Sequence, residues 1–261
     1  MKETLVIKLG GMLLNNNTII HRFFEILYNY YQSMYQNILI IHGGESWINY
    51  NYNNTYFSNT KDSTSNIVCY NTKISNMMKL DILSGTINKN IILHAKKNHF
   101  NTVGLCLTDG NDIILNSSHI NYENVVYSDS CSLIRYLFSR KILPVISPIG
   151  ITKDNILISI DSDVAAMLLA ISLKAKLIIL TDINGILDGK GNEIKVMTQS
   201  LSHQLISSGI ITHGMVVKVN TAIQVSKVLH QSVNIASLIN FIQLKKIFSK
   251  DIIGTLVCTN K

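Results

Sequence analysis

Short apolar segments alternate with longer helix-like segments along this chain, and this alternation most constrains its fold. The strand-like segments are residues 4–11, 37–44, 102–108, 142–149 and 176–181. The helix-like segments between them are residues 18–33, 73–97, 128–140 and 162–173. Continuous apolar strands joined by helices are typical of a parallel sheet that is covered on both faces. We therefore predict an α/β fold with a central, mainly parallel sheet.

The chain of 261 residues is long enough for two modest domains or one large α/β unit. Its 47% hydrophobic and 15% charged residues exclude a disordered chain. We expect residues 45–76 to form irregular or hairpin-like structure and a second unit to begin near residue 174. The elements expected in that unit are strand 176–181, loop 182–191, helix 198–207, a glycine-rich corner at 209–214, helix 215–229, and strands 234–237 and 254–259.

No apolar run reaches the ~18 residues that span a bilayer, and the first residues lack the layout of a signal peptide. We therefore expect a cytoplasmic protein. The net charge of +7 suggests nucleic acid or an acidic ligand, but the basic clusters are short and lack interleaved aromatic residues. We interpret the charge as compositional drift and expect neither a nucleic-acid nor a membrane partner. The four cysteines form no C-x-x-C pair, so we expect free thiols and no metal site.

Two predicted strands end in a glycine pair, Gly10-Gly11 and Gly43-Gly44. Ligands of open parallel sheets bind at the carboxyl ends of the strands, where glycine lets backbone N–H groups approach anionic oxygens. The first strand also contains Lys8 within its apolar run. A bare ammonium group in a core is costly unless it is paired. These features predict an anion-binding site.

Other charged residues allow two interpretations each. Asp161 and Asp163 begin an apolar helix, where they either cap the helix or hold lysines in place, and spacing alone favours capping. Lys218 is either solvated, as a lone helical lysine usually is, or functional, since valines and a methionine surround it. Asp182 ends a strand before a loop with three glycines, which does not fit a calcium-binding pattern.

In this order, several stretches resemble those of the amino acid kinase family, and within it the N-acetylglutamate kinases. The stretches are "IKLGG" at 7–11, "HGG" at 42–44, "SGTINK" at 84–89, "DINGILDGKG" at 182–191 and "GIITHGMVVKVN" at 209–220. The resemblance covers nearly the whole chain. It implies a three-layer αβα sandwich of two lobes, with residues 1–173 for amino-acid binding and dimerisation and residues 174–261 for ATP.

The activity implied by this resemblance is transfer of a phosphoryl group from ATP to the side-chain carboxylate of N-acetyl-L-glutamate, the second step of arginine biosynthesis. Lys8 would contact the transferring phosphoryl group, Lys218 would lie on the leaving-phosphate side, and Asp163 would hold both lysines. The implied substrate-binding residues are Gly10, Gly11, Gly43, Gly44, Glu45, Cys69 and Ser159. The implied ATP-binding residues are Asp182, Ile183, Asn184, Gly185, Ile186, Leu187, Ile210, Ile211 and Thr212. Mg²⁺ would be held mainly by the ATP phosphates.

The chain departs from the family pattern at three substrate-binding positions. Glu45 replaces a glycine, Cys69 stands where the family has an arginine for the substrate α-carboxylate, and Ser159 replaces an asparagine. Lys73 is a candidate substitute for that arginine, as a point charge without the bidentate fork. Three functions stay open: a weak N-acetylglutamate kinase, a kinase for another small acid, and a degenerate protein that retains nucleotide binding.

The expected quaternary structure also follows from the resemblance. In this family an N-terminal helix before the first strand accompanies arginine-inhibited hexamers. The first strand here begins at residue 4. We therefore expect a homodimer without arginine feedback.

Overall fold

The computed structural model describes residues 3–32, 37–44, 47–48, 72–110, 131–248 and 253–259. Within these residues an eight-stranded sheet runs through the molecule in the order β3-β4-β2-β1-β7-β9-β10-β8. Its strands are β1 (Thr4–Leu9), β2 (Asn37–His42), β3 (Thr102–Cys106), β4 (Leu143–Ser147), β7 (Lys176–Thr181), β8 (Val196–Thr198), β9 (Val233–Ser237) and β10 (Thr255–Cys258). All neighbouring strands pair in parallel except β9 and β10. The predicted mainly parallel sheet is therefore confirmed.

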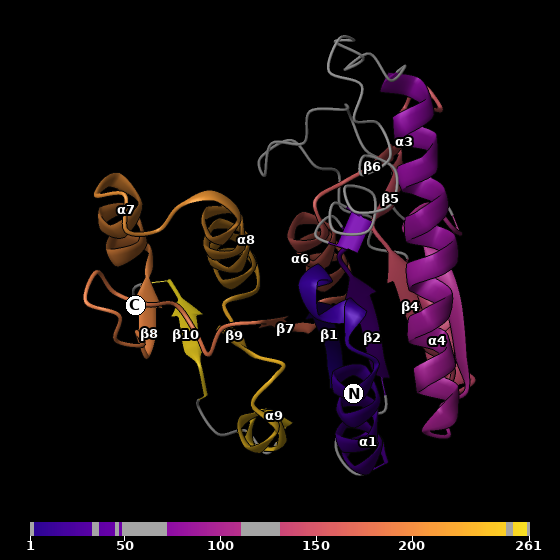
Figure 1. Cartoon of the computed structure of the whole chain (residues 1–261), viewed down its shortest axis with the longest axis horizontal. Coiled ribbons are helices and arrows are strands. Elements are labelled where there is room, and N and C mark those ends of the chain that lie inside the picture. Colours follow the sequence, from indigo (N-terminus) through magenta and orange to yellow (C-terminus); the bar gives the residue numbers. More distant parts are fainter. Residues whose placement is uncertain are drawn as a thin grey trace, which may run out of the picture.

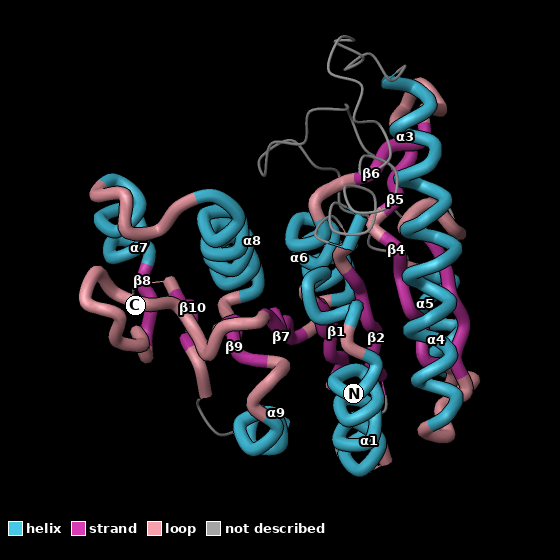
Figure 2. Tube along the Cα trace, in the orientation of Figure 1, coloured by secondary structure: helices cyan, strands magenta, loops and turns pink. Residues whose placement is uncertain are grey.

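Helices cover both faces of this sheet (Figures 1 and 2). In Figure 1 the strands run from β8 on the left to β4 on the right, with α6, α7 and α8 above them and α1 and α9 below. The helices are α1 (Asn17–Tyr31), α3 (Thr72–Asp81), α4 (Asn88–Lys97), α5 (Ser132–Ser139), α6 (Ser162–Leu173), α7 (Gln199–Ser207), α8 (His213–Leu229) and α9 (Phe241–Phe248). This arrangement confirms the three-layer αβα sandwich.

Two buried clusters of apolar side chains lie on opposite faces of the sheet. Successive residues of a strand point to opposite faces. In β1, Val6 belongs to the cluster under α6 and α8, whereas Leu5 and Ile7 belong to the cluster under α1 and α4. The continuous apolar runs read from the sequence thus reflect burial of both faces.

The predicted elements agree with the structure in most places. The helix at 162–173 and the strand at 176–181 have the predicted bounds. The predicted helix at 73–97 consists of α3, the π-helical segment η2 (Ile82–Ile87) and α4. Irregular or hairpin-like structure was expected at 45–76. Most of these residues lie outside the described ones, and α3 begins within this range, at Thr72. The sequence did not predict β8, α9, or the two-stranded sheet of β5 (Ile149–Ile151) and β6 (Leu157–Ser159).

Helix α6 is buried along nearly its whole length, which fixes the position of its first turn. It packs against β1 and α8, and its residues from Asp163 to Leu173 are all buried. A helix that is apolar on every side is stable only inside the protein. The Asp163 side chain in its first turn is therefore placed in the core beside β1.

Gly104 in β3 lies so close to α4 that an alanine methyl group would collide with the Asn88 and Ile92 side chains. Overpacking of this kind costs about 1–3 kcal/mol. We predict that Gly104→Ala lowers the free energy of unfolding by this amount in a denaturant titration. Gly85→Ala is the control, because no heavy atom lies within 4 Å of its added methyl group and alanine favours helix by about 0.5–1 kcal/mol. Equal stability of the two variants would contradict the tight packing.

Candidate active site

A cavity of about 270 Å³ opens at the carboxyl ends of β1, β2 and β7. Both glycine pairs line it, together with the side chains of Lys8, Asp163 and Lys218. Parallel strands bring their carboxyl ends to one edge of the sheet, where ligands of such folds bind. Segments that are far apart in the sequence therefore meet at one site.

The two glycine pairs pack directly against each other. The Gly10 N–H donates to the Leu180 carbonyl and the Gly43 N–H donates to the Leu9 carbonyl, each at 2.9 Å. A Cβ atom on Gly11 would lie 2.9 Å from the Gly44 nitrogen. Side chains at these turns would fill the cavity or collide with backbone, so glycine is required to let the backbone reach a ligand.

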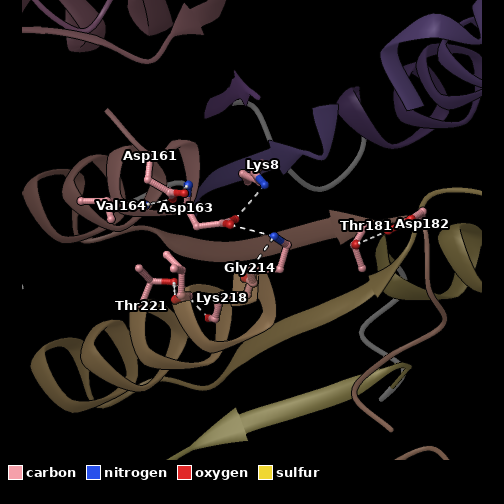
Figure 3. Close-up of polar contacts among 10 residues, drawn as sticks. Lys8, Asp161, Asp163, Val164, Thr181, Asp182, Gly214, Lys218 and Thr221 are labelled. Atoms are coloured by element: carbon pink, nitrogen blue, oxygen red, sulfur yellow. Dashed lines mark hydrogen bonds and ion pairs between the residues drawn. The ribbon is translucent and has the colours of Figure 1, made fainter. Parts of the chain in front are cut away.

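Asp163 holds two lysines at the base of the cavity (Figure 3). The Lys8 ammonium lies 2.8 Å from Asp163 Oδ1, and the Lys218 ammonium lies 3.0 Å from Oδ2. The Lys8 and Asp163 side chains are 4% and 3% exposed, and that of Lys218 is 17% exposed. Lys8 comes from β1, Asp163 from α6 and Lys218 from α8, so one carboxylate connects three elements.

Two opposing effects determine the charge of Asp163. Burial raises the pKa of its carboxyl group, but the charges of Lys8 and Lys218 and their hydrogen bonds outweigh burial and hold this pKa below its ordinary value. Asp163 is therefore ionised at neutral pH. Taken alone, this cluster of two ammonium groups and one carboxylate has one net positive charge, which suits an anionic ligand. The carboxylates of Asp161 and Asp182 also line the cavity.

Asp161 caps the helix, and Asp163 binds the lysines. Asp161 Oδ1 accepts hydrogen bonds from the backbone N–H groups of Asp163, at 2.7 Å, and Val164, at 3.2 Å. Burial and the neighbouring Asp163 charge raise the pKa of Asp161, and the two backbone donors oppose this rise. Of the two roles considered for these aspartates, helix capping therefore belongs to Asp161 and lysine binding to Asp163.

A second, more open cavity of about 750 Å³ adjoins the first through Asp182. The lining of this second cavity includes the side chains of Ile183, Asn184 and Leu187 and several residues at and after the end of β9. Ile186 and Ile211 are instead core residues, so only their backbone can reach a ligand. The other predicted ATP-binding residues lie nearby in the chain. Gly185 packs against Thr255, and Thr212 is the N-cap of α8. The Ile210 side chain is exposed and packs over Gly189.

Some predicted substrate-binding residues are not brought to the cavity by the described structure. Glu45 and Cys69 lie outside the described residues. Ser159 ends β6 and does not line the cavity, although Ile160 and Asp161 directly after it do. The sequence did not single out seven of the lining residues: Lys79, Leu83, Pro148, Ile160, Ser162, Thr181 and Gly214. Gly214 could have been found from the sequence, because it lies within the stretch at 209–220 on which the family resemblance depends.

A buried polar network supports the Gly43-Gly44 turn from behind. The His42 Nδ1 atom lies 2.9 Å from the Gly43 carbonyl, which can only accept, so Nδ1 carries the proton. The Nε2 atom then accepts from the Asn88 amide at 3.3 Å, and this amide also donates to the Val145 carbonyl at 2.9 Å. Burial lowers the pKa of His42 to about 4, against a smaller opposing effect of the Gly43 hydrogen bond. The imidazole is therefore neutral at physiological pH.

Neither a protein-bound metal cluster nor a membrane span is seen in the described part of the chain. No group of three or more His, Cys, Asp or Glu side chains there is placed to hold a metal ion. None of the helices in those residues is long and apolar enough to cross a membrane.

The fold and cavity define an α/β protein with a basic, glycine-lined cavity at the carboxyl edge of its sheet, where ligands of such folds bind. The model of the amino acid kinase family matches residues 3–237, and the chain belongs to this family. The family predicted from the sequence is thereby confirmed, and with it a kinase that uses ATP.

Relatives match the chain over nearly its whole length. An acetylglutamate kinase of Buchnera aphidicola is 40% identical and covers 98% of this chain and 99% of its own. An acetylglutamate kinase of Yersinia enterocolitica is 37% identical and covers 97% and 99%. The crystal structure of smu.665 from Streptococcus mutans is 20% identical, with a TM-score of 0.74 over 99% of both chains, and it is similar in fold.

Replacing Asp163 should destabilise the protein in a pH-dependent way. We predict that Asp163→Asn lowers the free energy of unfolding by about 3–5 kcal/mol at pH 7, because it leaves two ammonium groups without their carboxylate. The folded-state pKa is depressed, so the wild-type advantage is present above the unfolded pKa of about 4 and is lost as pH falls through the folded pKa. Denaturant titrations between pH 3 and pH 7 measure this difference.

The control is Asp154→Asn, which removes an exposed carboxylate in the turn between β5 and β6. We expect its stability to stay within about 0.5 kcal/mol of wild type across this range. A deficit of Asp163→Asn that is the same at pH 3 and pH 7 would contradict the depressed pKa.

His42 should contribute a second pH dependence. Its folded pKa of about 4 lies below the unfolded value of about 6.5. The unfolded chain therefore binds more protons at this group between these values, and the contribution of His42 to wild-type stability falls by up to roughly 1.4 kcal/mol for each pH unit from about 6.5 down to about 4. We predict that this slope is shallower in His42→Gln and unchanged in the exposed control His203→Gln. Parallel slopes in all three proteins would show that His42 titrates normally.

Proposed function

We propose that this chain phosphorylates the side-chain carboxylate of N-acetyl-L-glutamate with ATP, giving N-acetyl-L-glutamyl 5-phosphate in the second step of arginine biosynthesis. Relatives at 37–40% identity over nearly the whole chain carry the name acetylglutamate kinase, and the activity predicted from the sequence agrees with that name. The observation that carries the proposal in the structure is the pair of lysines held by one buried carboxylate beside two glycine turns.

Both reactants are anions, so the protein must neutralise charge and align them. In phosphoryl transfer, catalysis consists largely of positioning and electrostatic stabilisation. Lys8 lines the cavity with the glycine pairs and is bound to Asp163, and it would contact the transferring phosphoryl group. Lys218, at the more exposed side of the cluster, would neutralise the leaving phosphate. Asp163 would keep the two ammonium groups at fixed positions in spite of their mutual repulsion.

The glycine turns would supply the remaining donors. Backbone N–H groups near Gly10, Gly11 and Gly44 would bind phosphoryl and substrate oxygens, as oriented amides do in anion-binding sites. The nucleotide would extend from this cavity along the loop that begins at Asp182 and toward the residues before α8. Mg²⁺ would be held mainly by the ATP phosphates, and the Asp182 carboxylate in the lining offers the oxygen ligand that this ion prefers.

We propose that the two ligands bind to two lobes that follow each other in the sequence. Residues 1–173 form a lobe for the amino acid and for dimerisation, and residues 174–261 form the ATP lobe. The sheet is continuous between them, because β1 pairs directly with β7. Asp163 in the first lobe and Lys218 in the second are thereby in contact across this boundary. We further propose a cytoplasmic homodimer.

The assay that tests the function uses purified protein with ATP, Mg²⁺ and N-acetyl-L-glutamate, with the acyl phosphate trapped by hydroxylamine. We predict turnover by the wild type and a loss of about 10²–10³-fold in kcat for Lys8→Ala, which removes a charge at the reacting phosphoryl group. Lys96→Ala, on the exposed face of α4, is the matched control and should retain wild-type turnover.

The same assay separates the alternatives. Nucleotide binding measured by calorimetry, with no acyl phosphate from N-acetyl-L-glutamate at saturation, would overturn the proposal. Turnover of a different small acid would then identify a kinase of altered substrate, and none with any acid would identify a non-catalytic protein.

A further inference from the structure

A serine hydroxyl lines the cavity where the first turn of α6 meets the glycine turns. Ser162 lies between Asp161, which caps the helix, and Asp163, which holds the two lysines. Figure 3 shows the Asp163 side chain extending from this turn toward Lys8. Ser162 is half-buried and lines the same cavity. Its side chain is therefore placed beside the charged cluster, within reach of a ligand.

The Ser162 hydroxyl is not used by the protein itself. Among the residues that the structure describes, none forms a hydrogen bond with its Oγ atom. Capping does not require it, because Asp161 Oδ1 already accepts from the N–H groups of Asp163 and Val164. A hydroxyl group has one donor and two acceptor positions, and its hydrogen rotates toward the best acceptor. This group is thus free to donate to a bound anion.

Two backbone donors lie next to this hydroxyl. A Cβ atom on Gly43 would lie 3.1 Å from Ser162 Oγ and 3.2 Å from the Gly11 nitrogen. A Cβ atom on Gly11 would lie 2.9 Å from the Gly44 nitrogen. The N–H groups of Gly11 and Gly44 have no acceptor within the described ranges, whereas those of the other two glycines donate to strand carbonyls. One hydroxyl and two N–H groups therefore surround the place where the glycine turns touch.

Phosphoryl transfer needs several donors around one group. In a loose transition state, negative charge is spread over the three equatorial oxygens of the transferring phosphoryl group. Asp163 fixes the positions of the Lys8 and Lys218 ammonium groups, so these two approach the oxygens from one direction. Uncharged donors on another side stabilise the oxygens that the lysines do not reach, and they do so most strongly where water is excluded.

We propose that the Ser162 hydroxyl donates a hydrogen bond to the phosphoryl group during its transfer, beside the N–H groups of Gly11 and Gly44. The proposal rests on the function proposed above and adds a catalytic residue to it. The hydroxyl is held at the glycine turns while the phosphoryl group moves from one ligand to the other. Its bond is therefore made chiefly in the transition state, so Ser162 determines kcat far more than KM.

The test compares two serine-to-alanine variants. Ser162→Ala removes the hydroxyl and keeps the Asp161 cap. The control, Ser132→Ala, removes an exposed serine that is also the first residue of a helix, α5, and that does not line the cavity. The hydroxylamine assay gives kcat and KM for N-acetyl-L-glutamate, and a denaturant titration gives the stability.

Binding is measured by calorimetry with two probes. The first is ADP with Mg²⁺. The second contains ADP, Mg²⁺, N-acetyl-L-glutamate and aluminium fluoride, in which the fluoride complex stands for the phosphoryl group in transfer. The first probe lacks this group, so the difference between the two affinities reports on contacts with it.

We expect Ser162→Ala to lower kcat by about ten- to a hundredfold, the loss of one hydrogen bond to a charged group. Its KM should stay within about twofold of wild type. Affinity for the aluminium fluoride probe should fall by a factor similar to that in kcat, because this probe resembles the transition state. Binding of ADP and stability should equal those of the wild type, and Ser132→Ala should match the wild type throughout.

Three results would overturn the inference. An unchanged kcat in Ser162→Ala means that the hydroxyl does not touch the reacting group. A raised KM with an unchanged kcat assigns Ser162 to binding of the substrate before transfer. A loss of ADP affinity as large as the loss in kcat assigns it to the folding of the cavity.

The two kinds of measurement separate this inference from the function on which it rests. Wild-type turnover that Ser162→Ala retains in full overturns the inference alone. A wild type that does not phosphorylate N-acetyl-L-glutamate, but binds the aluminium fluoride probe more tightly than Ser162→Ala does, overturns the proposed reaction and upholds the hydroxyl contact. A wild type that neither phosphorylates this acid nor binds the probe overturns both.

Discussion

The arrangement of this molecule depends on one carboxylate that two lysines share. Asp163 sits in the first turn of a buried helix and contacts Lys8 of the central strand and Lys218 of α8. Either lysine alone beside Asp163 would form a neutral pair, and the two lysines without it would repel each other. Because desolvation of these charges is costly, the pairing constrains β1, α6 and α8 to one relative position. The charged centre is thus a structural constraint as well as a site.

The glycine turns complete this centre because the sheet brings them to the same edge. Each turn follows a buried strand, and the two turns touch through backbone. His42 holds the second turn from behind by donating to the Gly43 carbonyl, and Asn88 and Ser147 connect this network to α4 and β4. A neutral imidazole suits this fully buried place, because a buried cation without an anionic partner is costly.

The sequence predicted the parts of the structure that depend on local pattern. Continuous apolar runs gave the central strands, and the apolar stretch after Asp161 gave α6 with its observed bounds. The roles of Asp161 and Asp163 could not be separated from spacing, since both positions suit a helix start and only the tertiary structure brings the lysines. Asn88 and Ser147 were missed because they meet His42 from 46 and 105 residues away. The three-residue strands β5, β6 and β8 are too short to show a period.

Lys79 illustrates the same limit at the site itself. A lysine on a helix carries no local signal that separates a solvated side chain from one facing a ligand, and here only the contact of η2 with Gly44 brings its helix face to the cavity. Lys79 was therefore missed because tertiary packing, and not a local pattern, brings it into the lining.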